Sequence, residues 1–393
     1  TLSLIGAEGV FLLYSRSQTE GQRLLTCIPA MLLCYWCFGY GAWLCLALML
    51  AAGIIAHHQK LSALLAAGIL LLPATQYPAT TWWSKPDLDR EYVLSLDVEH
   101  YFGNIQKMRK HLETDRQILW VTYYRNLYNA THPSEINSPV SLSRNLLAWN
   151  QPGTNGLILP VNPSASFLSI LFANELWFTL GDMTMAEHCA MLSMIFSPRN
   201  SGSRMIKRLA EINLVNGDDE AALKYLRILD KTLLHKSWAE KRIPGQQTPR
   251  VKEWLEKKRR DIPTQDHLRS GNDAVTSLRN LVASNAGNLR AYEYLLCYHL
   301  LSKDLRSFVE DYVPGKVSSS IFAEALLIHL ARQGNIRAEE LIKYQIPVKI
   351  AKEFADYTRL YEAKDTSLKE KYGKTYWFYY HFATTEPGKE SKP

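Results

Sequence analysis

Hydrophobic residues are concentrated in the first 83 positions of the chain. The stretch from Leu24 to Ala56 contains 33 residues without Asp, Glu, Lys, Arg or His, and a second uncharged stretch runs from Leu61 to Tyr77. A single helix over the first stretch would be about 50 Å long, well beyond the ~30 Å hydrocarbon layer of a bilayer. Gly39-Tyr40-Gly41 favours a tight turn in its middle. The pattern predicts transmembrane helices over about residues 24–40, 41–57 and 61–78, together with a truncated span before residue 15.

The basic residues between these segments predict their orientation. Arg16 and Arg23 precede the first full span, and Lys60 lies between the second and third. Because Lys and Arg are retained in cytoplasmic loops, both basic loops are expected inside, and three crossings place the chain after about residue 80 on the outer face. The chain starts at Thr1 within an apolar segment, so we expect it to be part of a longer polytopic protein.

From residue 84 to 383 the pattern changes to amphipathic helical segments separated by short turns, without sustained strand alternation. One turn motif recurs, in which a Gly ends a helix in the left-handed conformation and the following Asp or Asn caps the next helix. Its copies are Gly181-Asp182, Gly217-Asp218 (36 residues later), Gly334-Asn335, the degenerate Gly103-Asn104 and the glycine-free Lys303-Asp304. Recurrence at this spacing is typical of helix-pair repeats.

Helix pairs can be placed around four of these turns. The predicted pairs are 166–180 with 184–196, 203–216 with 219–234, 289–301 with 305–312, and 319–333 with 336–344. A period near 34 residues indicates a tetratricopeptide-like α-solenoid, so the predicted fold class is all-α: N-terminal transmembrane helices (1–83) followed by a helical-repeat domain (84–383). A helical bundle without true repeats is the alternative. Residues 384–393 are polar and are expected to be a disordered tail.

Two segments interrupt the array. Residues 137–163 are rich in Asn, Pro and Gly and predict a long surface loop. Residues 242–272 contain the basic run Lys257-Lys258-Arg259-Arg260, which suggests a short basic helix. Nucleic acid, an anionic membrane surface and a solvated helix face are its possible roles, of which the solvated face is favoured. The aromatic segment Thr375–Phe382 is expected to close the open end of the solenoid.

Composition and charge do not identify a reaction or a ligand. The net charge is +7, and residues 1–83 hold three basic and two acidic residues, so +6 belongs to the remainder and favours a membrane lipid or acidic protein partner over nucleic acid. We find no nucleotide-binding, hydrolase or metalloprotease motif and assign no catalytic, cofactor-binding or metal-ligating residue. Glu8 is an intramembrane acid of possible functional importance. Pairing of Cys189 with Cys297 stays open.

Several segments carry a resemblance to a known family: Asn174–His188, Arg204–Leu209, Lys224–Arg227, Lys231–Leu233 and Tyr372–Tyr380. Together they resemble an uncharacterised family, a domain of unknown function, of multi-pass membrane proteins of Bacteroidota with a repeat-like helical C-terminal half. The resemblance covers nearly the whole chain. It implies a bacterial inner-membrane protein with the helical domain on the periplasmic side, and it supplies no catalytic residue.

Two functions follow from this organisation. The first is protein interaction or scaffolding in the cell envelope, in which the helical surface of residues 166–344 binds a partner protein. The alternative is the C-terminal part of a polytopic membrane glycosyltransferase whose catalytic residues lie in a missing N-terminal region, an argument from architecture alone. No enzyme activity is expected within the sequence itself.

Overall fold

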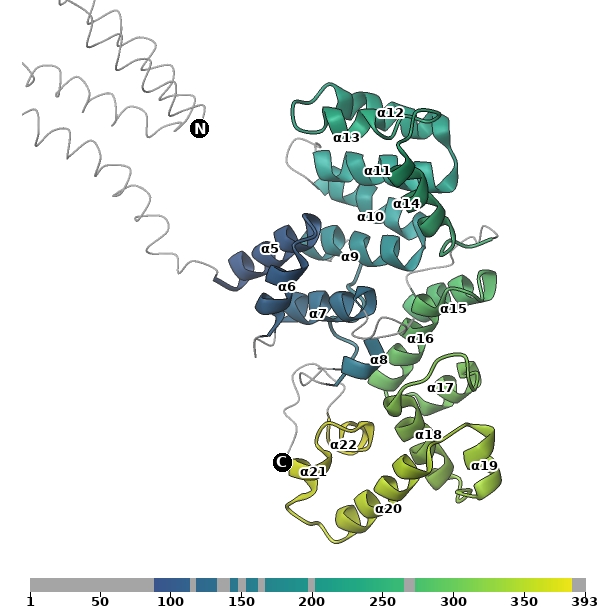
Figure 1. Ribbon diagram of the computed structural model, residues 1–393. Coiled ribbons are helices and arrows are strands. Elements are labelled where there is room, and N and C mark those ends of the chain that lie inside the picture. Colours follow the sequence, from purple (N-terminus) through teal and green to yellow (C-terminus); the bar gives the residue numbers. More distant parts are fainter. Residues whose placement is uncertain are drawn as a thin grey trace, which may run out of the picture. The chain divides into compact units, whose positions relative to one another are not determined.

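Short helices joined by tight turns build the part of the chain that the computed structural model describes (Figure 1). The described residues are 88–113, 118–132, 142–147, 153–161, 167–196, 202–264 and 273–383. Within them are eighteen helices and no strand. The chain divides into two units, Thr1–Leu88 and Asp89–Pro393, and the second holds nearly all described residues. The predicted all-helical character of residues 84–383 is thus confirmed where it is described.

The helices follow one another with few long connections. The first group is α5 (Leu88–Tyr101), α6 (Ile105–Leu112), α7 (Leu119–Thr131), α8 (Leu142–Asn145) and α9 (Phe167–Leu180). The second is α10 (Met183–Phe196), α11 (Ser203–Asn216), α12 (Asp219–Asp230), α13 (Lys236–Glu240) and α14 (Pro249–Arg259). The third is α15 (Ala274–Ser284), α16 (Leu289–Leu301), α17 (Leu305–Asp311), α18 (Ser320–Arg332), α19 (Ala338–Lys343), α20 (Val348–Glu362), α21 (Leu368–Tyr372) and α22 (Tyr376–Phe382).

The turn motif has one geometry at all five predicted copies. The glycines adopt positive φ, and at the glycine-free copy Lys303 does so too, with φ 59°. The residue after the turn donates its backbone N–H to the carbonyl five positions earlier, the hydrogen bond that closes a Schellman motif. These bonds are Asn104 to Glu99, Asp182 to Trp177, Asp218 to Asn213, Asp304 to His299 and Asn335 to Leu330.

The aspartates at three of these turns also cap the next helix. Carboxylates of Asp182, Asp218 and Asp304 accept from backbone N–H groups three residues ahead, at 2.9, 2.9 and 3.0 Å. Each bond satisfies a donor that a helix N-terminus leaves unpaired.

Consecutive helices pack around the turns. α9 packs on α10, α11 on α12 and α16 on α17, and α10 also packs on α11 and α17 on α18, so neighbouring pairs are in contact. The last predicted pair differs. α19 is only Ala338–Lys343 and buries none of its residues, whereas α18 packs on α20 and α22. The short α19 has little apolar surface to bury, so α18 packs on later helices.

The segment predicted as a surface loop contributes to the core instead. Its described parts, 142–147 and 153–161, bury apolar residues that include Leu142, Leu157 and Leu159. The short helix α8 contacts α7, α16 and α18. Ser143 donates its backbone N–H and hydroxyl to the buried Glu293 of α16 at 2.8 and 2.7 Å, which ties α8 to a helix 150 residues away.

The aromatic segment near the C-terminus forms α22. Its buried rings belong to Tyr376, Trp377 and Tyr379. The two tyrosine hydroxyls donate to Leu300 and Leu301 carbonyls at the end of α16, at 2.9 and 2.8 Å. α22 therefore covers the carbonyl end of α16, which a helix otherwise leaves without partners.

The membrane prediction is corrected here. The predicted spans at 24–40, 41–57 and 61–78 and the segment before residue 15 lie outside the described residues. Among the described helices none is both long and apolar enough to cross a bilayer. The longest of them, α20, has 15 residues, or about 22 Å, against the ~30 Å that a span requires. The fold class supported over the described residues is all-helical, with no membrane-spanning helix among them, so these residues give no support to the predicted transmembrane helices or to a multi-pass inner-membrane location.

Two glycines of the turn motif provide a matched test of the packing. Both have positive φ, 91° at Gly181 and 82° at Gly217, but a Cβ at position 181 would overlap the Asp261 carbonyl, whereas at position 217 nothing lies within 4 Å. Gly217→Ala is expected to lower the free energy of unfolding by about 1–2 kcal/mol through backbone strain alone. Gly181→Ala should cost a further ~1–3 kcal/mol, because residue 261 must move. Equal losses in chemical denaturation would contradict this packing.

Candidate functional site

A buried carboxylate in the middle of α9 is the centre of the candidate site. Glu175 follows Asn174 within an otherwise mainly apolar helix, and both side chains are buried. Asn174 donates to the Ala186 carbonyl of α10 at 2.6 Å, which joins the helix pair. A buried carboxylate is stable only when cations and hydrogen bonds compensate its lost hydration.

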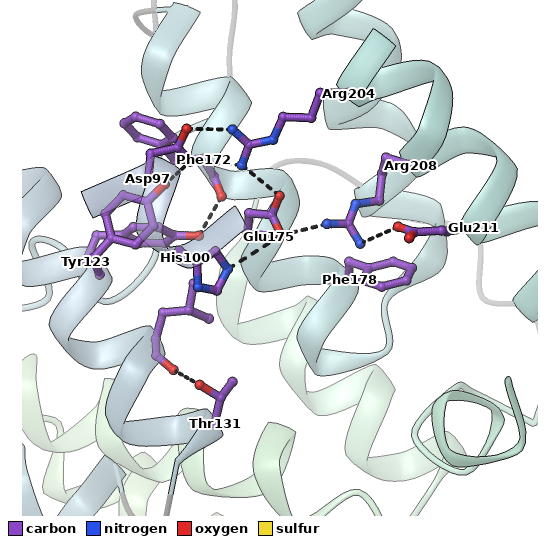
Figure 2. A network of polar contacts seen from close by, with 12 residues as sticks. Asp97, His100, Tyr123, Thr131, Phe172, Glu175, Phe178, Arg204, Arg208 and Glu211 are labelled. Carbon is purple, nitrogen blue, oxygen red and sulfur yellow. Dashed lines mark hydrogen bonds and ion pairs between the residues drawn. The ribbon is translucent and has the colours of Figure 1, made fainter. Parts of the chain in front are cut away.

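α11 supplies the two cations. Arg204 and Arg208 lie one turn apart, so both side chains point to the same side of the helix. Arg204 Nη2 lies 2.9 Å from Glu175 Oε1, and Arg208 Nη2 lies 2.6 Å from Glu175 Oε2. Arg208 also reaches Glu211 at 3.2 Å. Figure 2 shows both guanidinium groups around the Glu175 carboxylate.

α5 and α7 complete the cluster. Asp97 receives two hydrogen bonds from Arg204, at 2.6 and 2.8 Å, and one from the Tyr124 hydroxyl at 2.5 Å. His100 Nε2 lies 3.7 Å from Glu175 Oε2 (Figure 2). We call Asp97, His100, Glu175, Arg204 and Arg208 the charged cluster. It connects α5, α9 and α11, and the Tyr124 hydroxyl joins α7 to it.

The partners decide which groups are charged. Burial alone would raise the pKa of Glu175, but Arg208, His100 and Arg204 together hold this pKa well below its usual range. Burial opposes the charge of Arg204, yet Glu175 and Asp97 raise the pKa of Arg204 further. Burial, and then Asp97, raise the pKa of Tyr124 well above its ordinary value, so its hydroxyl remains a donor. The Glu175 carboxylate and the Arg204 guanidinium are therefore both charged at neutral pH.

A cleft of about 240 Å³ opens beside the charged cluster, and we call it the basic cleft. Its lining comes from α5, α9, α11 and α14, and consists of His100, Tyr101, Glu175, Phe178, Thr179, Arg204, Lys207, Arg208, Glu211, Trp254 and Lys258. Four of these are Lys or Arg and two are Glu. The two glutamates bind the arginines, which leaves the lysines as the unneutralised charges.

Aromatic rings and carbonyls hold the two lysines. Lys207 Nζ donates to the Tyr101 hydroxyl at 3.2 Å and lies 4.7 Å from the centre of that ring. Lys258 Nζ lies 4.5 Å from the centre of the Phe178 ring and 3.4 Å from the Phe178 carbonyl oxygen. Within the described residues neither ammonium has a carboxylate oxygen within 4 Å. Burial, and then the neighbouring Arg208 and Arg290, lower the pKa of Lys258 to about 8.

The basic run predicted from the sequence is the end of α14. Lys257, Arg259 and Arg260 are exposed, as expected of a solvated face. Arg259 donates to the Leu214 and Val215 carbonyls at 2.7 and 3.0 Å, and Lys258 reaches the last turn of α9. Cations are favourable at helix C-termini. The solvated-face prediction is confirmed for these three residues, and the structure adds that Lys258 and Arg259 contact the C-terminal ends of α9 and α11.

The other sequence candidates contribute no site. Cys189 and Cys297 are buried and form no disulfide. Glu8 lies outside the described residues. No group of three or more His, Cys, Asp or Glu in the described segments is arranged to hold a metal ion.

In the part of the chain that the structure describes, fold and site together define an all-helical protein with an ion-pair cluster beside a basic cleft. The chain belongs to the family of unknown function DUF6057, which matches residues 1–383. This match confirms the resemblance to an uncharacterised family that the sequence indicates. No curated protein and no solved structure matches the chain, so the tetratricopeptide-like repeat remains a prediction.

Neutralising the central carboxylate tests the structural role of the charged cluster. Glu175→Gln leaves Arg204 and Arg208 buried without their shared partner, and we expect a loss of about 3–5 kcal/mol in the free energy of unfolding. The matched control is Glu220→Gln on α12, whose pair with Lys224 is exposed and separated by 3.7 Å. This control should change stability by less than about 0.5 kcal/mol.

The same variant has a defined pH dependence. Because the folded pKa of Glu175 is lowered, its stabilisation is present above the unfolded pKa of about 4.3 and is lost as pH falls through the lower folded pKa. The difference between the natural protein and Glu175→Gln should therefore be constant near neutral pH and shrink below about pH 4. A difference that stays constant at acid pH would contradict a lowered pKa of Glu175.

Proposed function

We propose that residues 89–383 act as a protein-interaction or scaffolding module, and that the basic cleft binds an acidic side chain of the partner protein. The observation that carries the proposal is the pair of lysines in the cleft, Lys207 and Lys258, which have no carboxylate partner in the described residues. An acidic group that enters the cleft would neutralise the ammonium groups of Lys207 and Lys258.

The rim of the cleft supports a protein partner over a small anion. Phe102 is 69% exposed, and its ring packs edge-on against Tyr101, which lines the cleft. Val98 and Ile105, at the same corner between α5 and α6, are 49% and 40% exposed. Exposed apolar side chains beside a charged recess are typical of protein interfaces, in which aromatic anchors supply contact area and charges set specificity.

The overall charge favours the same kind of partner. The portion after residue 83 carries +6 of the net charge of the chain. A positive surface accelerates the encounter with an acidic partner and excludes basic ones.

Site-specific photocrosslinking tests this proposal in cells. A benzophenone amino acid replaces Phe102 at the rim, and the matched control replaces Tyr361 of α20, an aromatic residue that is 40% exposed. The experiment is carried out in the bacterium that encodes the protein, which the resemblance implies is a member of Bacteroidota. We expect a discrete protein adduct from position 102, absent from position 361, that falls at least tenfold when Lys207→Glu and Lys258→Glu are combined.

Three outcomes would contradict the proposal. They are no protein adduct from position 102, an adduct with lipid in place of protein, and a protein adduct that persists unchanged after both charge reversals. Folding of the charge-reversed protein is checked by circular dichroism, so that a lost adduct reports on binding.

A further inference from the structure

The number of unneutralised charges in the basic cleft restricts the kind of acidic group. Of the charged groups that line the cleft, Glu175 and Glu211 already accept from the N–H groups of Arg204 and Arg208. The ammonium groups of Lys207 and Lys258 are then the two lining charges without a carboxylate oxygen within 4 Å in the described residues. A side-chain carboxylate offers one negative charge to this pair, whereas a phosphate monoester offers close to two at neutral pH.

The remaining donors of the two lysines fit the same ligand. An ammonium group has three N–H donors, and the structure uses one from Lys207, toward the Tyr101 hydroxyl, and one from Lys258, toward the Phe178 carbonyl. Both groups are also held against ring faces, which fixes their positions without neutralising them. Each lysine therefore retains donors for the three acceptor oxygens of a phosphate ester.

We infer that the basic cleft binds a phosphate monoester, carried on a phosphorylated side chain of the partner protein, between Lys207 and Lys258. This inference rests on the proposed function, because it takes the partner to be a protein. Arg204 and Arg208 hold the wall of the cleft in place, and the two lysines make the contact.

The groups around Lys258 give the binding a characteristic pH profile. Arg208 and Glu211 of α11, Arg290 of α16 and Asp261 carry the charges that act on Lys258, and His100 of α5 lines the same cleft. With its pKa lowered to about 8, Lys258 loses its proton, and binding weakens, as pH rises through 8. A phosphate monoester loses its second charge as pH falls through about 6. Affinity should therefore peak between these values.

Calorimetric titration with two matched probes tests the inference. The probes are N-acetyl-O-phosphoserine amide and N-acetylglutamate amide, measured on the whole chain from pH 5 to 9. We expect the phosphoserine probe to bind at least tenfold tighter at pH 7 and to lose affinity on both sides of its peak. The glutamate probe should lose affinity only on the alkaline side, because its carboxyl has a pKa near 4. If the His100→Asn variant shows the same pH profile, titration of His100 is not the source of that profile.

Substitutions locate the binding. Lys207→Met and Lys258→Met should each weaken phosphoserine binding at least tenfold, whereas Lys224→Met on the exposed face of α12 should leave it within twofold. Equal affinity for the two probes, or binding that survives both lysine substitutions, would overturn the inference.

A phosphatase arm separates this inference from the proposed function and identifies the source of the phosphate. Crosslinking from position 102 is repeated in cell extract treated with phosphatase. Loss of the protein adduct supports a phosphorylated partner. Persistence of the adduct overturns the phosphate inference and leaves the protein-interaction proposal standing. Binding of the phosphoserine probe without any protein adduct from position 102 would overturn the proposed function and place a free phosphate compound in the cleft.

Discussion

The burial of Glu175 is the constraint on which this part of the structure depends. A carboxylate in the middle of a mainly apolar helix costs several kcal/mol in lost hydration unless cations surround it. Both oxygens of Glu175 are bound by arginines one turn apart on α11, and one of these arginines also holds Asp97 of α5. The apolar side chains of α9 permit many helix arrangements, but these hydrogen bonds fix the position of α5 and α11 relative to α9.

The same cluster explains why the adjacent cleft is basic. The two glutamates that line the cleft are engaged by Arg204 and Arg208, and within the described residues neither Lys207 of α11 nor Lys258 of α14 has a carboxylate oxygen within 4 Å. Their stabilisation comes instead from ring faces, a hydroxyl and the carbonyl end of α9. In our proposal the charge of Lys258 serves a ligand.

Local sequence patterns predict the turns between helices, but they do not predict the charged cluster or the cleft. Gly181 and Gly217, each followed by an aspartate, predict a helix end and a helix start within three residues, and the structure contains both. The charged cluster joins residues as far apart as Asp97 and Arg204, and no local pattern encodes that approach. Two signals for it existed: an acid within the apolar segment around Glu175, and arginines spaced by four on the next helix pair. The composition of the basic run Lys257–Arg260 indicates a charged helix, but it does not reveal that Lys258 and Arg259 contact the ends of α9 and α11.

The pKa of Lys258 tests the account most directly, because it reports whether a carboxylate pairs with this lysine. It can be measured by NMR titration of the Cε carbon in ¹³C-lysine-labelled protein, with the signal assigned through Lys258→Arg. The account predicts a pKa of about 8 in the unliganded protein and a higher value when the phosphoserine probe is bound. A value at or above the ordinary lysine pKa of about 10.4 without ligand would show that an anion of the chain already neutralises Lys258, and would contradict the account.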